Sequence, residues 1–316
     1  MHWLIYSSWR ARIKLIIPTL IALTAFAGNS ILCRLALGGK LIDPASFSAI
    51  RLSSGALILA VILLVSFRSK ARVKDSPRLR RSLMSMSTWF PALALFIYVI
   101  TFSLAYQYLT TGTGALVLFS SVQFTMVLYQ LWQGEKLSIR DWIGLSLAFL
   151  GFVLLVLPSL KTPSLIGFIL MACSGIAWAG YSLIGRGSKA PLEDTGMNFA
   201  LCLPMAALLL AFVTINQGFD ALYISGWGLL LALASGVFAS GLGYALWYFV
   251  LPSLGGARAA VVQLLVPVLA AVAGLLFARE NISLLFAVSS VMVLGGVFLV
   301  VKNRPRKHFE VRYVRR

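Results

Sequence analysis

Long uncharged runs separate the charged residues of this chain, and they limit what it can fold into. Nine stretches contain no Asp, Glu, Lys or Arg, among them 15–33, 82–134 and 221–257. About 20 consecutive apolar residues form a transmembrane helix, and an uncharged run of that length is rare in a soluble core. Since 60% of the residues are hydrophobic and only 11% are charged, the whole chain is predicted to be one membrane domain.

The number of spans follows from the lengths of these runs. The longest run, 82–134, is long enough for two spans, and the turn-forming cluster at 110–114 divides it. The first run is interpreted as a true span, because the apolar region of a signal peptide is shorter and ends at a small-residue cleavage site. The ten predicted spans are 15–36, 44–66, 89–108, 114–132, 139–157, 164–184, 197–215, 225–249, 257–277 and 282–301.

The basic residues indicate the orientation of the chain in the membrane. There are 27 basic and 9 acidic residues, and the net charge of +18 by itself would suggest a nucleic-acid or anionic partner. With the amino terminus inside the cell, 22 of the 27 basic residues fall in cytoplasmic segments, in line with the positive-inside rule. We therefore expect no nucleic-acid partner. We expect anionic lipids to contact the basic loops. The protein is expected in a bacterial inner (plasma) membrane, with both termini in the cytoplasm.

Residue sets typical of enzymes and metal sites are missing from the sequence. Cys33, Cys173 and Cys202 fall within predicted spans, while His2 and His308 lie in the tails. No Cys or His pair has metal-ligand spacing, and no Ser/His, Cys/His or paired-carboxylate set suggests catalysis. We therefore expect no enzyme activity, no catalytic residue, no metal and no cofactor.

The two halves of the chain are similar in sequence. Residues 25–34 align without a gap to 177–186, and residues 115–157 align to 260–302. Each half has five spans, an odd number, so the second half enters the bilayer from the opposite side. The predicted fold is an all-α polytopic membrane protein with ten transmembrane helices in two inverted five-helix repeats, an arrangement suited to alternating access. The predicted domains are a first repeat at 1–158, a second repeat at 159–302 and a basic cytoplasmic tail at 303–316.

Several short motifs stand out, most of them at corresponding places in the two halves. They are the aromatic-Ala-Gly segments that lead to a basic residue at 26–34 and 178–186, Pro44 leading to Arg51, Gly134-Glu135, Arg279-Glu280, Gly151 and Gly295-Gly296. With these motifs and its ten spans, nearly the whole chain resembles the EamA type of the drug/metabolite transporter superfamily. The resemblance implies a secondary transporter whose fifth and tenth spans lie outside the central cavity. Val122 and Arg279 depart from the family pattern, which often has Pro and Gly there.

Polar and aromatic side chains within the predicted spans indicate where a substrate could pass. Polar groups in hydrocarbon need a cavity or a neighbouring helix, and several here recur at helical spacing, so that they share one face. For the amide side chains, both helix packing and ligand binding remain open. The predicted substrate-binding residues are Asn29, Tyr98, Gln123, Trp178, Tyr181, Tyr244 and Gln263.

Five charged residues within or near span ends are structural or coupling candidates. They are Arg34, Arg51, Glu135, Arg186 and Glu280. Arg51 lies seven residues into its span from Pro44, and we expect its long side chain to reach the outer head-group region or a backbone carbonyl. The glutamates are expected to hold loop geometry. In the inverted plan Arg34 and Glu280 fall on the outer side, whereas Glu135 and Arg186 fall on the inner side.

The predicted function is secondary transport of small metabolites by alternating access, with amino-acid export as the favoured case. Since the acidic residues map to loops or span ends, facilitated diffusion or substrate exchange is expected. Two alternatives remain: drug efflux coupled to protons or another cation, in which a span-end Glu could take part, and a membrane receptor that does not transport. The expected partners are a small-molecule substrate and the lipid bilayer, with the protein a monomer or a homodimer.

Overall fold

The computed structural model describes residues 2–69, 86–134, 138–156, 164–185, 188 and 190–302. Apart from an isolated β-bridge between Ile42 and Ile224, these residues fold into helices and the turns that join them. The helices are α1 (His2–Gly38), α2 (Pro44–Ser69), α4 (Met86–Ala105), α5 (Thr111–Trp132), α6 (Ile139–Val156), α7 (Ser164–Gly185), α8 (Pro191–Gln217), the 3-10 turn η2 (Phe219–Ala221), α9 (Gly226–Ala234), the π-helix η3 (Ser235–Leu242), α10 (Gly243–Gln263), α11 (Leu265–Phe277) and α12 (Leu284–Lys302).

The prediction of ten apolar helical segments is confirmed for the described residues, with α9, η3 and α10 forming one of them. Six of the segments are long and apolar enough to cross a membrane, and shorter apolar helices cover 89–105, 265–277 and 284–300. Large apolar side chains also cover the outside of the molecule, as at Leu208, which is 71% exposed, and Leu276, which is 66% exposed. Such a surface is unfavourable in water and suits contact with lipid.

The boundary between the eighth and ninth spans differs from the sequence prediction. A loop was expected between 249 and 257, yet α10 continues to Gln263 and the helix breaks at Leu264. A single Arg at 258 ends an uncharged run without ending a helix. The next helix, α11, begins at Leu265 with Pro267 in its first turn, where the missing backbone N–H of proline removes no helical hydrogen bond.

The seventh span also begins earlier than expected. Helix α8 starts at Pro191 instead of 197, and Glu193 and Asp194 lie in its first turn. Proline at the first helical position and acidic residues near the helix amino terminus both favour a helix start. The charges that excluded these residues from an uncharged run therefore belong to the same helix.

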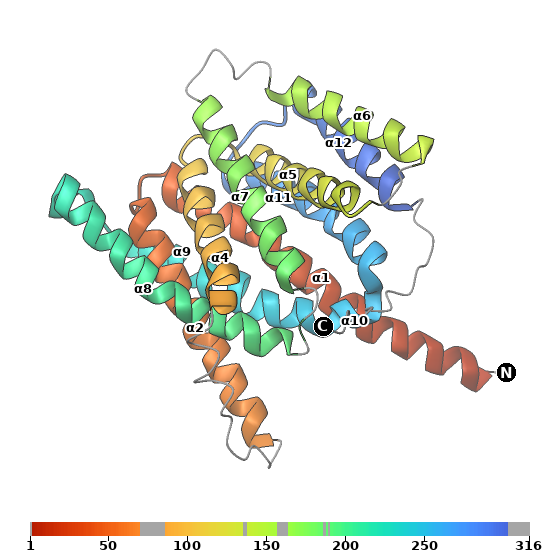
Figure 1. Cartoon of the computed structure of the whole chain (residues 1–316), viewed down its shortest axis with the longest axis horizontal. Helices are drawn as coiled ribbons and strands as arrows, with labels where there is room; N and C mark the ends of the chain where they lie inside the picture. The colour runs from red at the N-terminus through yellow and green to blue at the C-terminus, as the bar shows by residue number, and fades with distance from the viewer. Residues whose placement is uncertain are drawn as a thin grey trace.

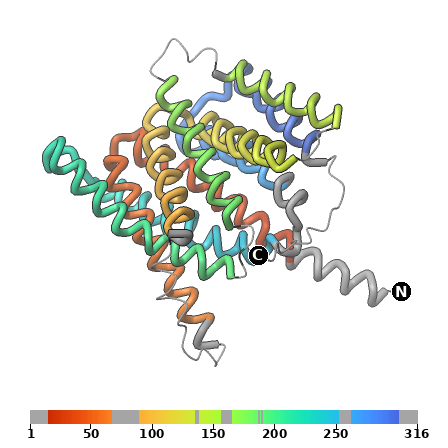
Figure 2. Tube along the Cα trace, in the orientation of Figure 1, coloured from red at the N-terminus to blue at the C-terminus, as the bar shows by residue number. Residues whose placement is uncertain are grey.

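The two halves of the chain interlock instead of forming separate bundles. Helix α1 packs against α9, η3, α10 and α11, while α4 and α5 pack against α7. Figure 1 shows α1 running through the centre of the molecule, and Figure 2 shows this early helix, in red, beside the late helices in cyan and blue. The pairings are related by exchange of corresponding helices, since α4 with α7 matches the α9–η3–α10 segment with α1. This exchange supports the proposal of two five-helix repeats.

Four interhelical connections meet at one end of the molecule. The connection after α1 pairs with the one before α9, through the Ile42–Ile224 bridge and through the Tyr223 backbone N–H, which donates to Asp43. At the same end, Arg34 binds Glu280 from the α11–α12 connection and the Tyr106 carbonyl from the α4–α5 connection. The sequence had assigned these connections to a common side of the membrane, and the structure brings them together.

Helices α6 and α12 pack closely along a strip of small residues at one edge of the molecule (Figure 1). A Cβ atom added to Gly144 would lie 2.6 Å from the Gly296 carbonyl oxygen, and one added to Gly296 would lie 2.6 Å from the Ala148 backbone nitrogen. Small residues let helix backbones approach in this way within a membrane.

This contact predicts a difference between two adjacent glycines of α12. We expect Gly296→Ala to lower the free energy of unfolding in detergent micelles by about 1–2 kcal/mol, because overpacking against backbone is costly. Gly295→Ala is the matched control, since a Cβ there meets nothing within 4 Å. It should leave stability unchanged or raise it by up to about 1 kcal/mol through helix propensity. Equal stability of the two variants would contradict this account of the α6–α12 contact.

Candidate functional site

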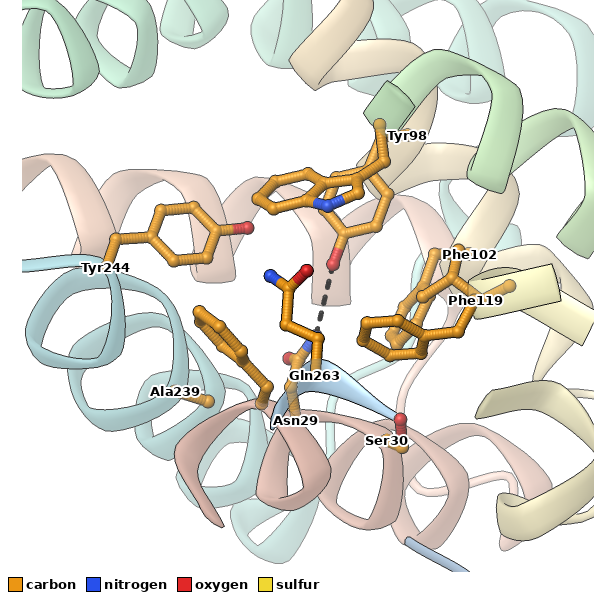
Figure 3. A pocket seen from close by; sticks show the side chains of 11 residues that line it. Asn29, Ser30, Tyr98, Phe102, Phe119, Ala239, Tyr244 and Gln263 are labelled. Atoms are coloured by element: carbon orange, nitrogen blue, oxygen red, sulfur yellow. Dashed lines mark hydrogen bonds between the residues drawn. The ribbon is translucent and has the colours of Figure 1, made fainter. Parts of the chain in front are cut away.

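A small cavity lies at the centre of the helix bundle, where both halves of the chain contribute its walls (Figure 3). Its volume is about 30 Å³. The lining residues are Phe26, Asn29, Ser30, Tyr98, Phe102, Leu118, Phe119, Trp178, Ala239, Tyr244 and Gln263. In Figure 3 the hydroxyls of Tyr98 and Tyr244 and the amide of Gln263 point toward the middle of this space.

The structure brings together most of the residues predicted to bind substrate. Those that line the cavity are Asn29, Tyr98, Trp178, Tyr244 and Gln263. Gln123 and Tyr181 do not line it, in contrast to the expectation. Gln123 is buried on α5 one helical turn beyond Phe119. It therefore lies on the same face of α5 as the cavity-lining Phe119, but too far along the helix axis to line the cavity. The Tyr181 hydroxyl donates to Thr195 on α8.

A chain of hydrogen bonds runs beside the cavity and joins α1, α2, α4 and η3. The Ser235 hydroxyl donates to Asn29 Oδ1 at 2.6 Å, and Asn29 Nδ2 makes a long contact of 3.5 Å with the Tyr98 hydroxyl. Arg51 Nη2 donates to the same hydroxyl at 3.1 Å, while Arg51 Nε donates to the Ser240 hydroxyl at 3.0 Å. The two halves of the chain are therefore linked by buried polar contacts at the site.

The position of Arg51 corrects the sequence prediction. Its side chain was expected to reach the head-group region or a backbone carbonyl, but Arg51 is only 1% exposed. Its guanidinium carbon lies 5.4 Å from the ring centroid of Tyr98 and 5.2 Å from that of Phe102. Both rings line the cavity. The side chain points inward because hydroxyls and aromatic faces on α4 and η3 give it partners there.

The π-helix η3 explains how two serines reach the hydrogen-bond chain. Residues five apart on an α-helix differ by about 140° in direction. The wider π turn, with its i→i+5 hydrogen bonds, brings Ser235 and Ser240 nearer to one face. Gly236 lets this turn press against α2, because a Cβ there would lie 2.5 Å from the Arg51 carbonyl oxygen.

Aromatic rings form much of the cavity wall. The Trp178 ring lies 4.9 Å from that of Tyr98 and 5.3 Å from that of Tyr244, centroid to centroid. Phe26 meets Tyr244 edge-on at 5.8 Å. Such a wall suits an apolar or aromatic group, while the hydroxyls and amides at its edge can orient a polar one.

The cavity is small in this conformation. Its volume of about 30 Å³ is far below the roughly 300–1,000 Å³ of ligand pockets, so a metabolite does not fit without a change of conformation. The walls come from helices of both halves, so a relative movement of these helices would enlarge it.

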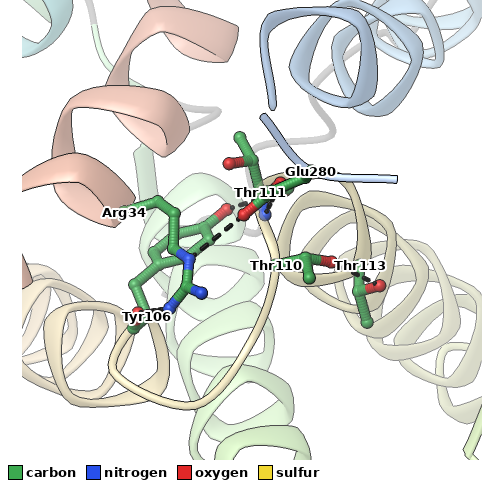
Figure 4. A network of polar contacts seen from close by, with 6 residues as sticks. All are labelled: Arg34, Tyr106, Thr110, Thr111, Thr113 and Glu280. Atoms are coloured by element: carbon green, nitrogen blue, oxygen red, sulfur yellow. Dashed lines mark hydrogen bonds and ion pairs between the residues drawn. The ribbon is translucent and has the colours of Figure 1, made fainter. Parts of the chain in front are cut away.

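A second polar network closes the end of the bundle at which the four connections meet (Figure 4). Arg34 Nε forms an ion pair of 3.1 Å with Glu280 Oε1, and Arg34 Nη1 donates to the Tyr106 carbonyl at 3.1 Å. Glu280 Oε2 accepts the Thr111 backbone N–H at 2.8 Å. This carboxylate thereby holds α1, the start of α5 and the α11–α12 connection together.

Several site features were missed by sequence reasoning, and others fall outside the structure's described part. Glu135 and Arg186, the predicted inner counterparts of Glu280 and Arg34, lie outside the described residues, as does the tail at 303–316. The lining residues absent from the predicted substrate-binding set are Phe26, Ser30, Phe102, Leu118, Phe119 and Ala239. Small and purely apolar residues give no polar signal. Arg51 had a signal, because a charge deep within an apolar run is by default a candidate for function.

Comparison with known proteins gives consistent matches. A model of the EamA-like transporter family matches residues 13–157 and again 165–302. A Pseudomonas aeruginosa protein described as uncharacterized protein PA1977 is 44% identical, over 92% of this chain and 96% of that protein. A probable amino-acid metabolite efflux pump of Escherichia coli is 23% identical, over 60% of this chain and 67% of the pump. One solved crystal structure has the same fold, with a TM-score of 0.61 and 18% identity over 93% of this chain and 100% of that chain.

Proposed function

The chain belongs to the EamA-like transporter family, and we propose that it carries a small organic metabolite across the membrane by alternating access. One observation carries the proposal: a central cavity built from both halves, with an aromatic wall and a few convergent polar groups. Its small volume in this conformation fits a state between outward and inward opening. Interlocked repeats of opposite orientation provide the two conformations that such a cycle requires.

An amino acid or a related metabolite is the proposed substrate, and export is the proposed direction. The side-chain amides and hydroxyls at the cavity can bind polar groups, and the aromatic rings can bind an apolar side chain. A relative named as a probable amino-acid metabolite efflux pump supports this choice. The proposed location is the bacterial inner membrane with both termini in the cytoplasm, which puts the Arg34–Glu280 network on the outer side.

Transport is proposed to be facilitative or by exchange. Among the described residues no carboxylate or histidine lines the cavity, and Glu280 lies at the end of the bundle, where it is paired with Arg34. Proton-driven transporters commonly place a titratable group along the substrate path. The absence of such a group from the described cavity wall supports a mechanism without obligatory proton coupling.

Counterflow in proteoliposomes tests the proposal. With excess unlabelled amino acids inside, we expect labelled amino acid outside to accumulate transiently, at equal pH on both sides. Protein-free liposomes provide the control for leakage. A flux that stops when a pH gradient is removed would overturn the uncoupled mechanism, and no flux across a panel of amino acids and nucleosides would overturn metabolite transport.

A further inference from the structure

Arg51 is a buried cation whose charge has no partner of opposite sign in the described structure. The ion pair between described residues joins Arg34 and Glu280, at the end of the bundle. The hydrogen-bond partners of Arg51 are two neutral hydroxyls, those of Tyr98 and Ser240. A buried charge without an opposite charge is costly, so its presence beside the cavity needs an explanation.

The guanidinium also has an unused donor. Arg51 Nη1 is buried and has no hydrogen-bond partner among the described residues. The adjacent Nη2 donates to one hydroxyl, that of Tyr98, at 3.1 Å. The Nη1–Nη2 edge of a guanidinium matches the two oxygens of a carboxylate, and in this conformation that edge is half occupied.

A purely structural role accounts for only part of this arrangement. Two neutral hydrogen bonds that join α2 to α4 and η3 explain Nε and Nη2. They leave Nη1 without an acceptor, and the aromatic faces of Tyr98 and Phe102 offset only part of the positive charge. An anion that arrives with the substrate would satisfy both.

We propose that Arg51 binds the carboxylate of the substrate, an inference that rests on the proposed transport function. The carboxylate oxygens accept hydrogen bonds from Nη1 and Nη2, and replace the Tyr98 hydroxyl at Nη2. The guanidinium lies beside the Tyr98 and Phe102 rings, which line the cavity, and a rotation of Tyr98 would expose its free edge. The hydrogen bond from Asn29 to the Tyr98 hydroxyl is long at 3.5 Å and opposes this rotation only weakly.

The same geometry specifies the class of substrate. With the carboxylate at Arg51, the rest of the molecule lies among Phe26, Trp178 and Tyr244, whose rings suit an apolar or aromatic body. A ligand with a net positive charge is disfavoured, because Arg51 repels it across a medium of low dielectric. The site thus selects small carboxylates, zwitterionic amino acids included, over cationic drugs.

Equilibrium binding to the full-length protein in detergent tests the proposal. The probes share one ring: labelled L-phenylalanine, with unlabelled 3-phenylpropionate, which keeps the carboxylate, and L-phenylalaninamide, which lacks it, as competitors. In the wild type we expect 3-phenylpropionate to compete and the amide to bind at least about 30-fold more weakly. In Arg51→Gln we expect the affinity for both acids to fall by about that factor, so that acid and amide bind alike.

Two further variants separate charge from structure. Arg51→Lys keeps the charge but lacks the paired N–H donors of the guanidinium edge, and it should retain part of the acid preference. Ser120→Ala removes a buried hydroxyl that donates to the Leu116 carbonyl of its own helix and does not line the cavity, so it should retain the full preference. If Arg51→Gln fails to fold, the ratio of acid to amide affinity in the wild type and in Arg51→Lys still tests the proposal.

The outcomes distinguish this inference from the proposed function. An acid preference that survives in Arg51→Gln, equal binding of acid and amide by the wild type, or no binding of either acid would overturn the role of Arg51. Acid-selective binding that depends on Arg51, in a protein that moves no substrate in proteoliposomes, would support the anion site and overturn transport.

Discussion

Replacing Trp178 with Ala is expected to lower counterflow in proteoliposomes at least about 30-fold, at unchanged insertion into the membrane. The Trp178 ring lies between those of Tyr98 and Tyr244, with centroid distances of 4.9 and 5.3 Å. Truncation of a central aromatic residue in a binding site commonly costs 2 kcal/mol or more, about 30-fold in affinity. It also frees Tyr98 and Tyr244 to move, which disturbs the polar edge of the cavity.

Trp142→Ala is the matched control for the loss of an indole ring. Trp142 lies on α6 and is 55% exposed, away from the cavity lining. Its flux should stay within about twofold of the wild type, because contacts at an exposed position contribute little. Wild-type flux in Trp178→Ala, measured per molecule of folded protein, would show that substrate does not pass through this cavity.

A second control uses one of the two predicted binding residues that do not line the cavity. Gln123→Ala changes a buried amide on α5 that does not line the cavity. We expect the apparent substrate affinity to remain near that of the wild type. A loss as large as that of Trp178→Ala would mean that another conformation places Gln123 in the substrate path.

Glu280→Gln is expected to increase about tenfold the rate at which a cysteine in the cavity reacts with a thiol reagent. The reagent is added from the end of the bundle that Arg34 and Glu280 close. The reporter is Ser30→Cys, a cavity position one turn from Arg34 on α1, in a protein whose native cysteines are replaced by alanine. Removing the charge weakens the ion pair with Arg34 and the hydrogen bond from the Thr111 backbone N–H. A coupling free energy of 1–3 kcal/mol between network and opening corresponds to a change of about 5- to 150-fold.

Two further variants make this expectation specific. Glu193→Gln removes an exposed acid from the first turn of α8 and should leave labelling unchanged. The charge swap Arg34→Glu with Glu280→Arg should fail to restore closure, because the Thr111 N–H then faces a cation and the Tyr106 carbonyl faces a carboxylate. Unchanged labelling in Glu280→Gln, or full recovery in the swap, would contradict the role of this network in closing the bundle.

The membrane character and the number of spans followed from the sequence because a charge in hydrocarbon is costly, so uncharged runs mark helices. The same rule misplaced two boundaries. The helix that begins at Pro191 contains two acids in its first turn, and the helix that ends at Gln263 contains Arg258. Charge spacing reports what hydrocarbon excludes, whereas caps and prolines decide where a helix begins and ends.

The face of each helix was also readable from the sequence, since helical periodicity places Asn29, Tyr98 and Trp178 toward the interior. Periodicity does not give the depth of a residue along the axis, which is why Gln123 was expected in the cavity, nor does it give the partner helix. The inward position of the Arg51 side chain depends on hydroxyls and rings of α4 and the π-helix η3. Its two hydroxyl partners lie 47 and 189 residues away in the chain. The sequence by itself therefore determined a ten-span membrane protein, and only the packing of its helices decided which charge lies at the centre and which pair closes the end.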